Sequence, residues 1–162
     1  MRLSRLVYCS MEHDNMNESD LMEILKVAID RNNANGITGI LAYGNCRFLQ
    51  LLEGPRQEVN ETYARISKDD RHNRVQLIDF REVESRMFSE WSMRILSIQE
   101  NALNRNAIYK YNGSKKFLPE TLTVTQAVGL LSELAEHDVV QNLSPRIVAG
   151  DQVKSSRQFA CS

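Results

Sequence analysis

Two short runs of β-forming residues joined by a turn constrain the fold of this chain most strongly. The runs are GITGILAY and RFLQLLEG, and Gly44-Asn45 between them is a typical hairpin turn. We therefore expect two adjacent antiparallel strands in the middle of a sheet. The rest of the chain must be arranged around this hairpin.

The segments on either side of the hairpin predict helices and further strands. Residues 3–9 alternate apolar and polar side chains, which is typical of a strand, and this strand carries Tyr8. Ser19 is the expected N-cap of a helix that ends around residues 32–36, and Pro55 opens a second helical pattern. VQLIDF and SMRILSI supply two more strands. The order β-α-β-β-α-β-β predicts an α+β, ferredoxin-like fold, with both helices on one face of an antiparallel sheet.

The pattern changes after residue 98. A polar helical stretch lies near residues 100–110, and another helix begins near residue 124, after Thr123 as its candidate cap. Its apolar stripe consists of Val124, Val128, Leu131 and Leu134. We expect this stripe to cover the free face of the sheet. The chain is thus divided into a domain of residues 1–98, a helical extension of residues 99–143 and a tail of residues 144–162, which we expect to be flexible.

Composition excludes several classes of function. With 20 basic and 21 acidic side chains, the chain has no general attraction to nucleic acid or anionic lipid. No stretch approaches the ~18 apolar residues of a membrane span. Three cysteines in no zinc-ligand spacing indicate no structural metal, and their odd number fits a reducing compartment. We therefore expect a cytoplasmic protein that binds neither nucleic acid nor a membrane.

Three polar residues of the predicted sheet and helix each have a structural and a functional interpretation. Tyr8 is most simply a core aromatic residue whose hydroxyl is hydrogen-bonded to a neighbour. Gln50 lies in an apolar run, where an amide without a partner is costly to bury, so something polar must face it. Asn32 lies shortly before Gly36, and a helix terminator is its simplest interpretation.

The blocks RLVYCS, GITGILAY, FLQLLEGP, YARISKDDRH and FSEWSM, in this order and spacing, resemble those of BLUF domains, the flavin-binding blue-light sensors of bacteria. The resemblance covers about residues 3–98 without interruption. It implies a flavin cofactor, with FAD first and FMN or riboflavin as alternatives, and a photoreceptor that turns over no substrate. It further implies that blue light moves an electron and a proton from Tyr8 to the flavin. Gln50 is then left in a new hydrogen-bonding state.

The same resemblance assigns site residues. It implies that Asn32 bonds the carbonyl and imide edge of the flavin ring, and that Ile24 and Ile66 are the walls on either side of it. Trp91 and Met93 belong to the segment through which movement around the glutamine reaches the outer face. The cofactor-binding set that it implies is Ile24, Arg31, Asn32, Phe48, Gln50, Arg65, Ile66, Asp69, Arg71 and His72.

The chain departs from the family pattern at Arg31. Many relatives have a second asparagine or a histidine at this position, so the resemblance does not imply the usual flavin contact here. Arg31 is expected instead to meet the ribityl or phosphate part of the flavin as a charged donor.

The resemblance also bears on output and on partners. Fewer than 70 residues follow Ile98, which leaves no room for a typical attached cyclase or phosphodiesterase domain. We therefore expect signalling through a homo-oligomer or through a separate protein partner such as a response regulator.

Two other classes of function remain as alternatives. An acylphosphatase-like hydrolase shares the chain order and needs an arginine and an asparagine converging on phosphate, which Arg31 and Asn32 resemble. An RNA-recognition module needs exposed aromatics on adjacent central strands and a basic face, and neither is evident. Asp69 and His72 have no further ligand at useful spacing, so they indicate no metal site.

Overall fold

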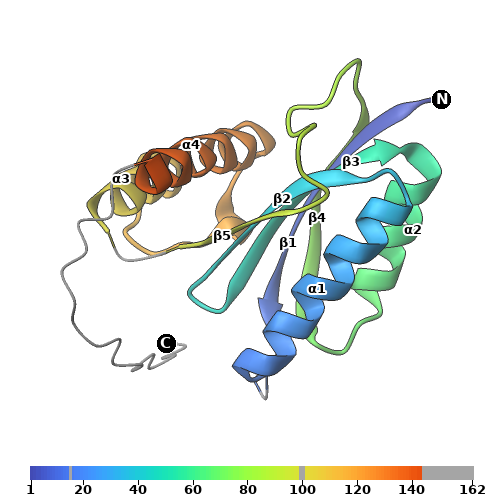
Figure 1. Ribbon diagram of the computed structural model, residues 1–162. Helices are drawn as coiled ribbons and strands as arrows, with labels where there is room; N and C mark the ends of the chain where they lie inside the picture. Colours follow the sequence, from blue (N-terminus) through green and yellow to red (C-terminus); the bar gives the residue numbers. More distant parts are fainter. Residues whose placement is uncertain (15, 99–100, 144–162) are drawn as a thin grey trace.

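The structure, a computed structural model, describes residues 1–14, 16–98 and 101–143. A five-stranded sheet with the strand order β4-β1-β3-β2-β5 forms its centre (Figure 1). The strands are β1 (Leu3–Glu12), β2 (Thr38–Gly44), β3 (Arg47–Pro55), β4 (His72–Glu82) and β5 (Arg94–Ser97). The α+β, ferredoxin-like arrangement is confirmed. The expectation of a wholly antiparallel sheet is wrong in one respect, because β5 runs parallel to β2.

The central hairpin is present, but its turn lies one residue later than expected. Gly44 is still in β2, opposite Arg47 of β3. Asn45 and Cys46 form the turn, and their φ angles of 50° and 54° give the twist that matches two antiparallel strands. Gly44 is needed for another reason, since a Cβ there would lie 2.8 Å from Cβ of Ile98.

Helices α1 (Glu18–Ala34) and α2 (Arg56–Ser67) cover one face of the sheet (Figure 1). The expected cap of α1 is wrong by two residues, because Asn17 and not Ser19 caps the helix. The Asn17 side chain accepts a hydrogen bond from the Asp20 amide, and the Asp20 carboxylate accepts one from the Asn17 amide. Between these helices and the sheet lies an apolar cluster that includes Leu6, Leu25, Ile37, Leu52 and Val59.

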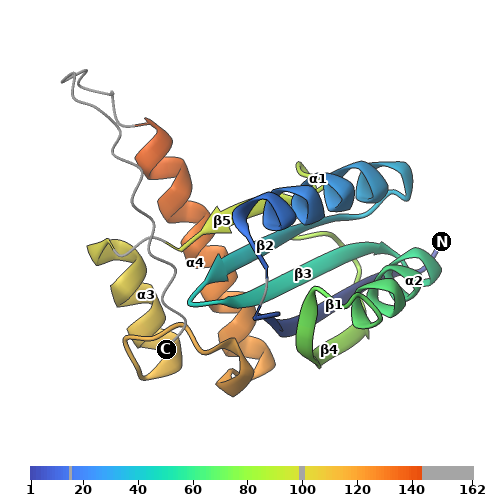
Figure 2. The same cartoon turned by 90° about the horizontal axis from the view of Figure 1, so that it is seen from below.

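The opposite face of the sheet is covered by the C-terminal helices. These are α3 (Ala102–Asn112), the single-turn η1 (Pro119–Thr121) and α4 (Val124–Leu143). Figure 2 shows α4 across the sheet from α1. Leu131 and Leu134 are buried in a second apolar cluster with residues of the sheet such as Ile40 and Leu51, and Val128 packs against this cluster. The expected docking of this helix is confirmed for these three residues, whereas Val124 is not part of the cluster.

Two further sequence expectations concern the ends of this extension. Thr123 caps α4, since its hydroxyl accepts a hydrogen bond from the Gln126 amide and the Gln126 side chain accepts one from the Thr123 amide. The expected tail of residues 144–162 lies outside the described residues. Within the described part of the chain, no helix is both long and apolar enough to span a membrane.

Candidate functional site

A cavity lies between α1, α2 and the sheet, and its lining unites residues that are far apart in the sequence. It contains Tyr8 and all of the cofactor-binding set named above, from Ile24 to His72. Four further lining residues were missed by the sequence analysis: Val27, Ala28, Leu41 and Thr62. Helical spacing from Ile24 would have indicated the first two, since residues three and four apart share a face. Leu41 stands opposite Gln50 in the hairpin register, which would have indicated it as well.

A chain of three side chains starts at the floor of this cavity with Tyr8 and Gln50 and ends at Met93 beyond the lining. Tyr8 on β1 and Gln50 on β3 stand directly opposite each other, so their side chains leave the same face of the sheet. The Tyr8 hydroxyl donates to Oε1 of Gln50. Nε2 of Gln50 in turn lies 3.3 Å from the sulfur of Met93. Gln50 is 4% exposed, and each end of its amide has a partner, which offsets the cost of burying it.

Burial keeps Tyr8 in its protonated form. The side chain is 1% exposed, and this burial raises the pKa of Tyr8 above its ordinary value. The nearby Tyr63 and Asp69 act in the same direction. The phenol is therefore neutral at physiological pH and is a hydrogen-bond donor to the amide.

Asn32 does not end its helix. Helix α1 continues to Ala34, and Asn35 is the C-cap. The Asn32 side chain is 2% exposed, and its Nδ2 donates to the carbonyl oxygen of Ser92 at 3.1 Å. Asn32 thus connects the cavity with the segment that precedes β5.

This segment, residues 91–93, is held at three consecutive positions. The Gly39 amide donates to the carbonyl oxygen of Trp91 at 3.1 Å, Asn32 bonds Ser92, and Gln50 contacts Met93. Each of these contacts comes from the cavity or from β2 beside it. The segment before β5 is therefore bonded to the cavity lining and to β2 at each of its three residues.

Trp91 and Met93 lie on opposite sides of the sheet, and neither lines the cavity. Met93 is buried in the cluster under α1 and α2. Trp91 packs against the cluster under α4, and the Arg94 guanidinium lies 4.4 Å from its ring centroid. Of the four residues predicted to form the switch, Tyr8, Gln50 and Met93 are thus joined by side-chain contacts, whereas Trp91 lies on the other side of the sheet.

The polar part of the lining contains a tight ion pair. The Asp69 carboxylate accepts hydrogen bonds from Nε and Nη2 of Arg71 at 2.9 and 2.6 Å, and from the Arg71 backbone amide at 3.0 Å. These bonds lower the pKa of Asp69 to about 2 and raise the pKa of Arg71. Both groups are therefore charged at neutral pH.

The remaining polar lining is neutral or cationic. Burial lowers the pKa of His72, and its Nδ1 lies 2.9 Å from the Ser10 hydroxyl. Nη2 of Arg65 donates to the Thr62 hydroxyl at 2.8 Å, and Arg31 lines the same cavity. Three arginines and a single carboxylate thus give this part of the lining an excess of positive charge. Within the described residues, no group of three or more His, Cys, Asp or Glu side chains is placed to hold a metal ion.

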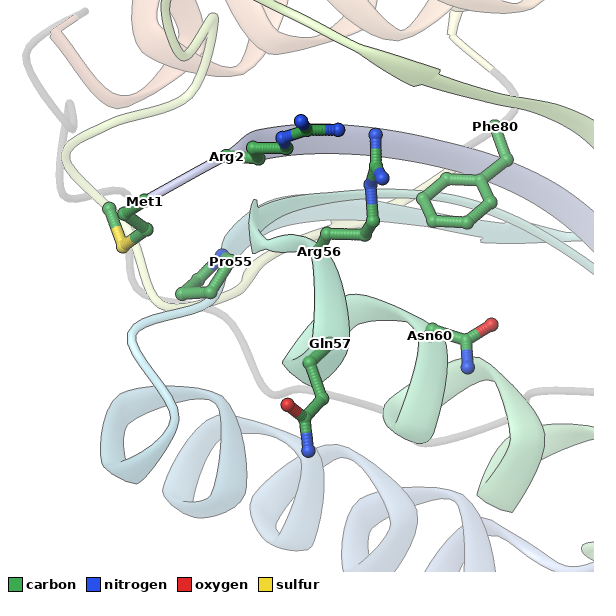
Figure 3. Close-up of a pocket in the computed structure, with 7 residues that line it drawn as sticks. All are labelled: Met1, Arg2, Pro55, Arg56, Gln57, Asn60 and Phe80. Carbon is green, nitrogen blue, oxygen red and sulfur yellow. The ribbon is translucent and has the colours of Figure 1, made fainter.

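A second hollow lies at the start of β1 and α2, and Figure 3 shows the residues that line it. Arg2 and Arg56 are exposed there, and both contact Glu82. Phe80 is 40% exposed. Neither Tyr8 nor Gln50 takes part in its lining. The candidate site is therefore the cavity under α1 and α2.

Comparison with known proteins gives one family and several relatives. The family model for BLUF domains, sensors of blue-light using FAD, matches residues 3–94. Photoactivated adenylate cyclase subunit beta of Euglena gracilis is 37% identical over 92 residues, which are 56% of this chain and 11% of that protein. The blue light- and temperature-regulated antirepressor BluF of Escherichia coli (strain K12) is 33% identical over 99 residues, 60% of this chain and 24% of that protein. The chain thus spans about a tenth to a quarter of the length of these relatives.

Solved structures resemble a larger part of the chain. The photo-activated state of BlsA has a TM-score of 0.73 and 31% identity, over 82% of this chain and 94% of that chain. The dark state of BlrB, a BLUF protein, has a TM-score of 0.67 and 29% identity, over 85% of this chain and 97% of that chain. The hydrolase alternative finds no support among these proteins.

Proposed function

Because this chain belongs to the BLUF family of blue-light sensors that use FAD, we propose that its cavity holds the flavin and that Tyr8 and Gln50 form the light-driven switch. The observation that carries the proposal is the buried chain Tyr8, Gln50 and Met93. In this chain the Tyr8 hydroxyl is the proton donor, and the Gln50 amide can exchange its donor and acceptor ends. Met93, the residue before β5, is the third member.

The lining fits a flavin in both shape and charge. Ile24, Ile66 and Phe48 offer apolar surface to a flat ring, while the amides of Gln50 and Asn32 can bond its polar edge. The cluster of Arg31, Arg65 and Arg71 suits the ribityl and phosphate part, since arginine binds phosphate through paired hydrogen bonds. In this proposal Arg31 meets this part of the flavin, in place of the contact that the usual family pattern has at its position.

Tyr8 is suited to give up an electron together with a proton. The bound flavin supplies absorption of blue light and an acceptor for both. In the dark, burial keeps the Tyr8 phenol protonated and bonded to Oε1 of Gln50. After the charges recombine, Tyr8 regains its proton, so no substrate is consumed and the only lasting change is in Gln50.

Gln50 supports two states because an amide has a donor end and an acceptor end. In the structure, Oε1 faces Tyr8 and Nε2 faces the Met93 sulfur. Rotation or tautomerisation of the amide exchanges these roles. A thioether sulfur accepts weakly and donates nothing, so a carbonyl turned toward Met93 loses this contact. Met93 is then released from Gln50, and the segment before β5 can move.

The output passes from β5 to the C-terminal helices in this proposal. Residues 1–98 form the sensor and residues 99–143 form the output extension. A change in α3 and α4 alters a homo-oligomer or the binding of a separate protein such as a response regulator. Support comes from the packing of α4 on the face of the sheet opposite the cavity.

The flavin proposal is tested by the absorption spectrum of the purified protein. We expect a yellow protein with noncovalently bound flavin whose visible absorption shifts slightly to the red under blue light and recovers in darkness. A colourless protein that cannot be reconstituted with FAD, FMN or riboflavin would contradict the proposal.

The output proposal is tested by light scattering and by pull-down, each in darkness and under blue light. A hydrogen-bond change worth about 1–3 kcal/mol alters an affinity by roughly 5- to 150-fold, so we expect a measurable change in apparent mass or in partner recovery. An apparent mass and a partner yield that are the same in both conditions, while the spectrum still shifts, would show that the helices carry no output.

A further inference from the structure

Arg94 connects the candidate site with α4 through several contacts of one side chain. It is the first residue of β5 and follows Met93 directly. Its Nη2 donates to the carbonyl oxygen of Ala135 at 3.0 Å and to Oδ2 of Asp138 at 2.8 Å. The same guanidinium lies over the ring of Trp91. A single cation thus bridges the segment before β5 and the second half of α4.

The contacts of Arg94 with α4 are hydrogen bonds, whereas the rest of α4 packs on the sheet through apolar side chains. Leu130, Leu131 and Leu134 meet the sheet through apolar surface, which is non-directional. Hydrogen bonds from a planar guanidinium have strict geometry, so a small displacement weakens them. The side chain of Arg94 is only 11% exposed, and a buried charge that loses its partner is costly. The Arg94 bridge is therefore sensitive to movement of β5.

We propose that Arg94 is the positioning residue that couples the state of Gln50 to α4. The proposal rests on the light-driven switch described above. While Gln50 holds Met93, the backbone at Arg94 is fixed and the guanidinium binds Ala135 and Asp138. When Met93 is released, the start of β5 shifts, and the bridge to α4 loosens. Arg94 does not line the cavity, so in this proposal it acts on the output and not on the photochemistry.

The test compares the flavin-loaded chain of 162 residues with its Arg94→Met variant, in which methionine keeps an unbranched apolar side chain but removes the charge. Hydrogen exchange of residues 124–138 is measured in darkness and under blue light, beside the absorption shift. In the unaltered protein we expect faster exchange in the light. In Arg94→Met the exchange should be fast already in darkness. The ratio of the exchange rates in light and in darkness should therefore fall by at least about fivefold, which is the lower end of usual coupling strengths. The absorption shift should be retained.

Matched variants separate coupling from a merely structural role. Arg105→Met removes an exposed arginine from α3 and should keep both the shift and the full ratio. Arg94→Lys should restore part of the ratio. Asp138→Asn removes the charge of the carboxylate on α4 that binds Arg94, and this side chain is partly exposed. This variant should also lower the light-to-dark ratio of exchange rates. It therefore decides the question even if Arg94→Met fails to fold.

The outcomes distinguish this inference from the proposed function. A full light-to-dark ratio in Arg94→Met, or in Asp138→Asn when Arg94→Met does not fold, overturns the role of Arg94. An absorption shift in the unaltered protein without any change in α4 exchange overturns it too. If the unaltered protein binds flavin but shows no shift, the proposed switch has failed, and with it the premise of the coupling.

Discussion

Tyr8→Phe is expected to abolish the light-induced red shift while the protein still folds and retains flavin. Phenylalanine keeps the ring that fills the space under α1 and α2, but it has no hydroxyl to donate to Gln50. It also has no proton to give to the excited flavin. The loss leaves Oε1 of Gln50 without its donor in a buried site, so the free energy of unfolding should fall by about 1–3 kcal/mol.

The control for this variant is Tyr63→Phe. Tyr63 lies in α2, and its ring centroid is 5.6 Å from that of Tyr8, so it tests a second phenol close to the same position. We expect Tyr63→Phe to keep the red shift and its recovery in darkness, measured by absorption at equal flavin content. A full, dark-reverting shift in Tyr8→Phe would exclude Tyr8 as the donor.

The order of elements was predictable because it depends on local patterns, and local spacing also groups the part of the cavity lining that α1 contributes. Ile24, Ala28 and Arg31 lie four and three residues apart in α1, so helical geometry alone places them on one face. The cap of α1 was predictable as well. Asn17 is followed three residues later by Asp20, which completes a capping box, whereas Ser19 is followed at that spacing by Met22.

The position of β5 and the separation of Trp91 from Met93 were not predictable in the same way. β5 has four residues and adds to the sheet as a parallel neighbour of β2, which no local pattern specifies. Residues two apart in a strand share a face, so strand geometry would place Trp91 and Met93 together. They precede β5, in irregular backbone whose contacts to Gly39, Asn32 and Gln50 decide where each side chain goes.

Gln50→Ala should also lose the red-shifted state, but for a different reason. Tyr8 keeps its hydroxyl and can still give up an electron and a proton. The amide whose hydrogen bonds change after this transfer is absent. Quenching of flavin emission by Tyr8 should therefore persist in Gln50→Ala and decrease in Tyr8→Phe. Flavin should be retained, because the substitution leaves intact the apolar cavity lining formed by Ile24, Phe48 and Ile66.

The stability of Gln50→Ala provides an independent check on the hydrogen bond itself. Tyr8 is left buried without its acceptor, which should cost about 1–3 kcal/mol in the free energy of unfolding. Because both substitutions remove the same bond, their effects in a double variant should be less than additive. Gln57→Ala is the control, since Gln57 is an exposed glutamine that bonds Glu61 on the surface of α2. Among the described residues, Gln50 is the only side chain whose hydrogen bonds join Tyr8 to Met93. A full red shift that recovers in darkness in Gln50→Ala would therefore contradict the proposed hydrogen-bond switch.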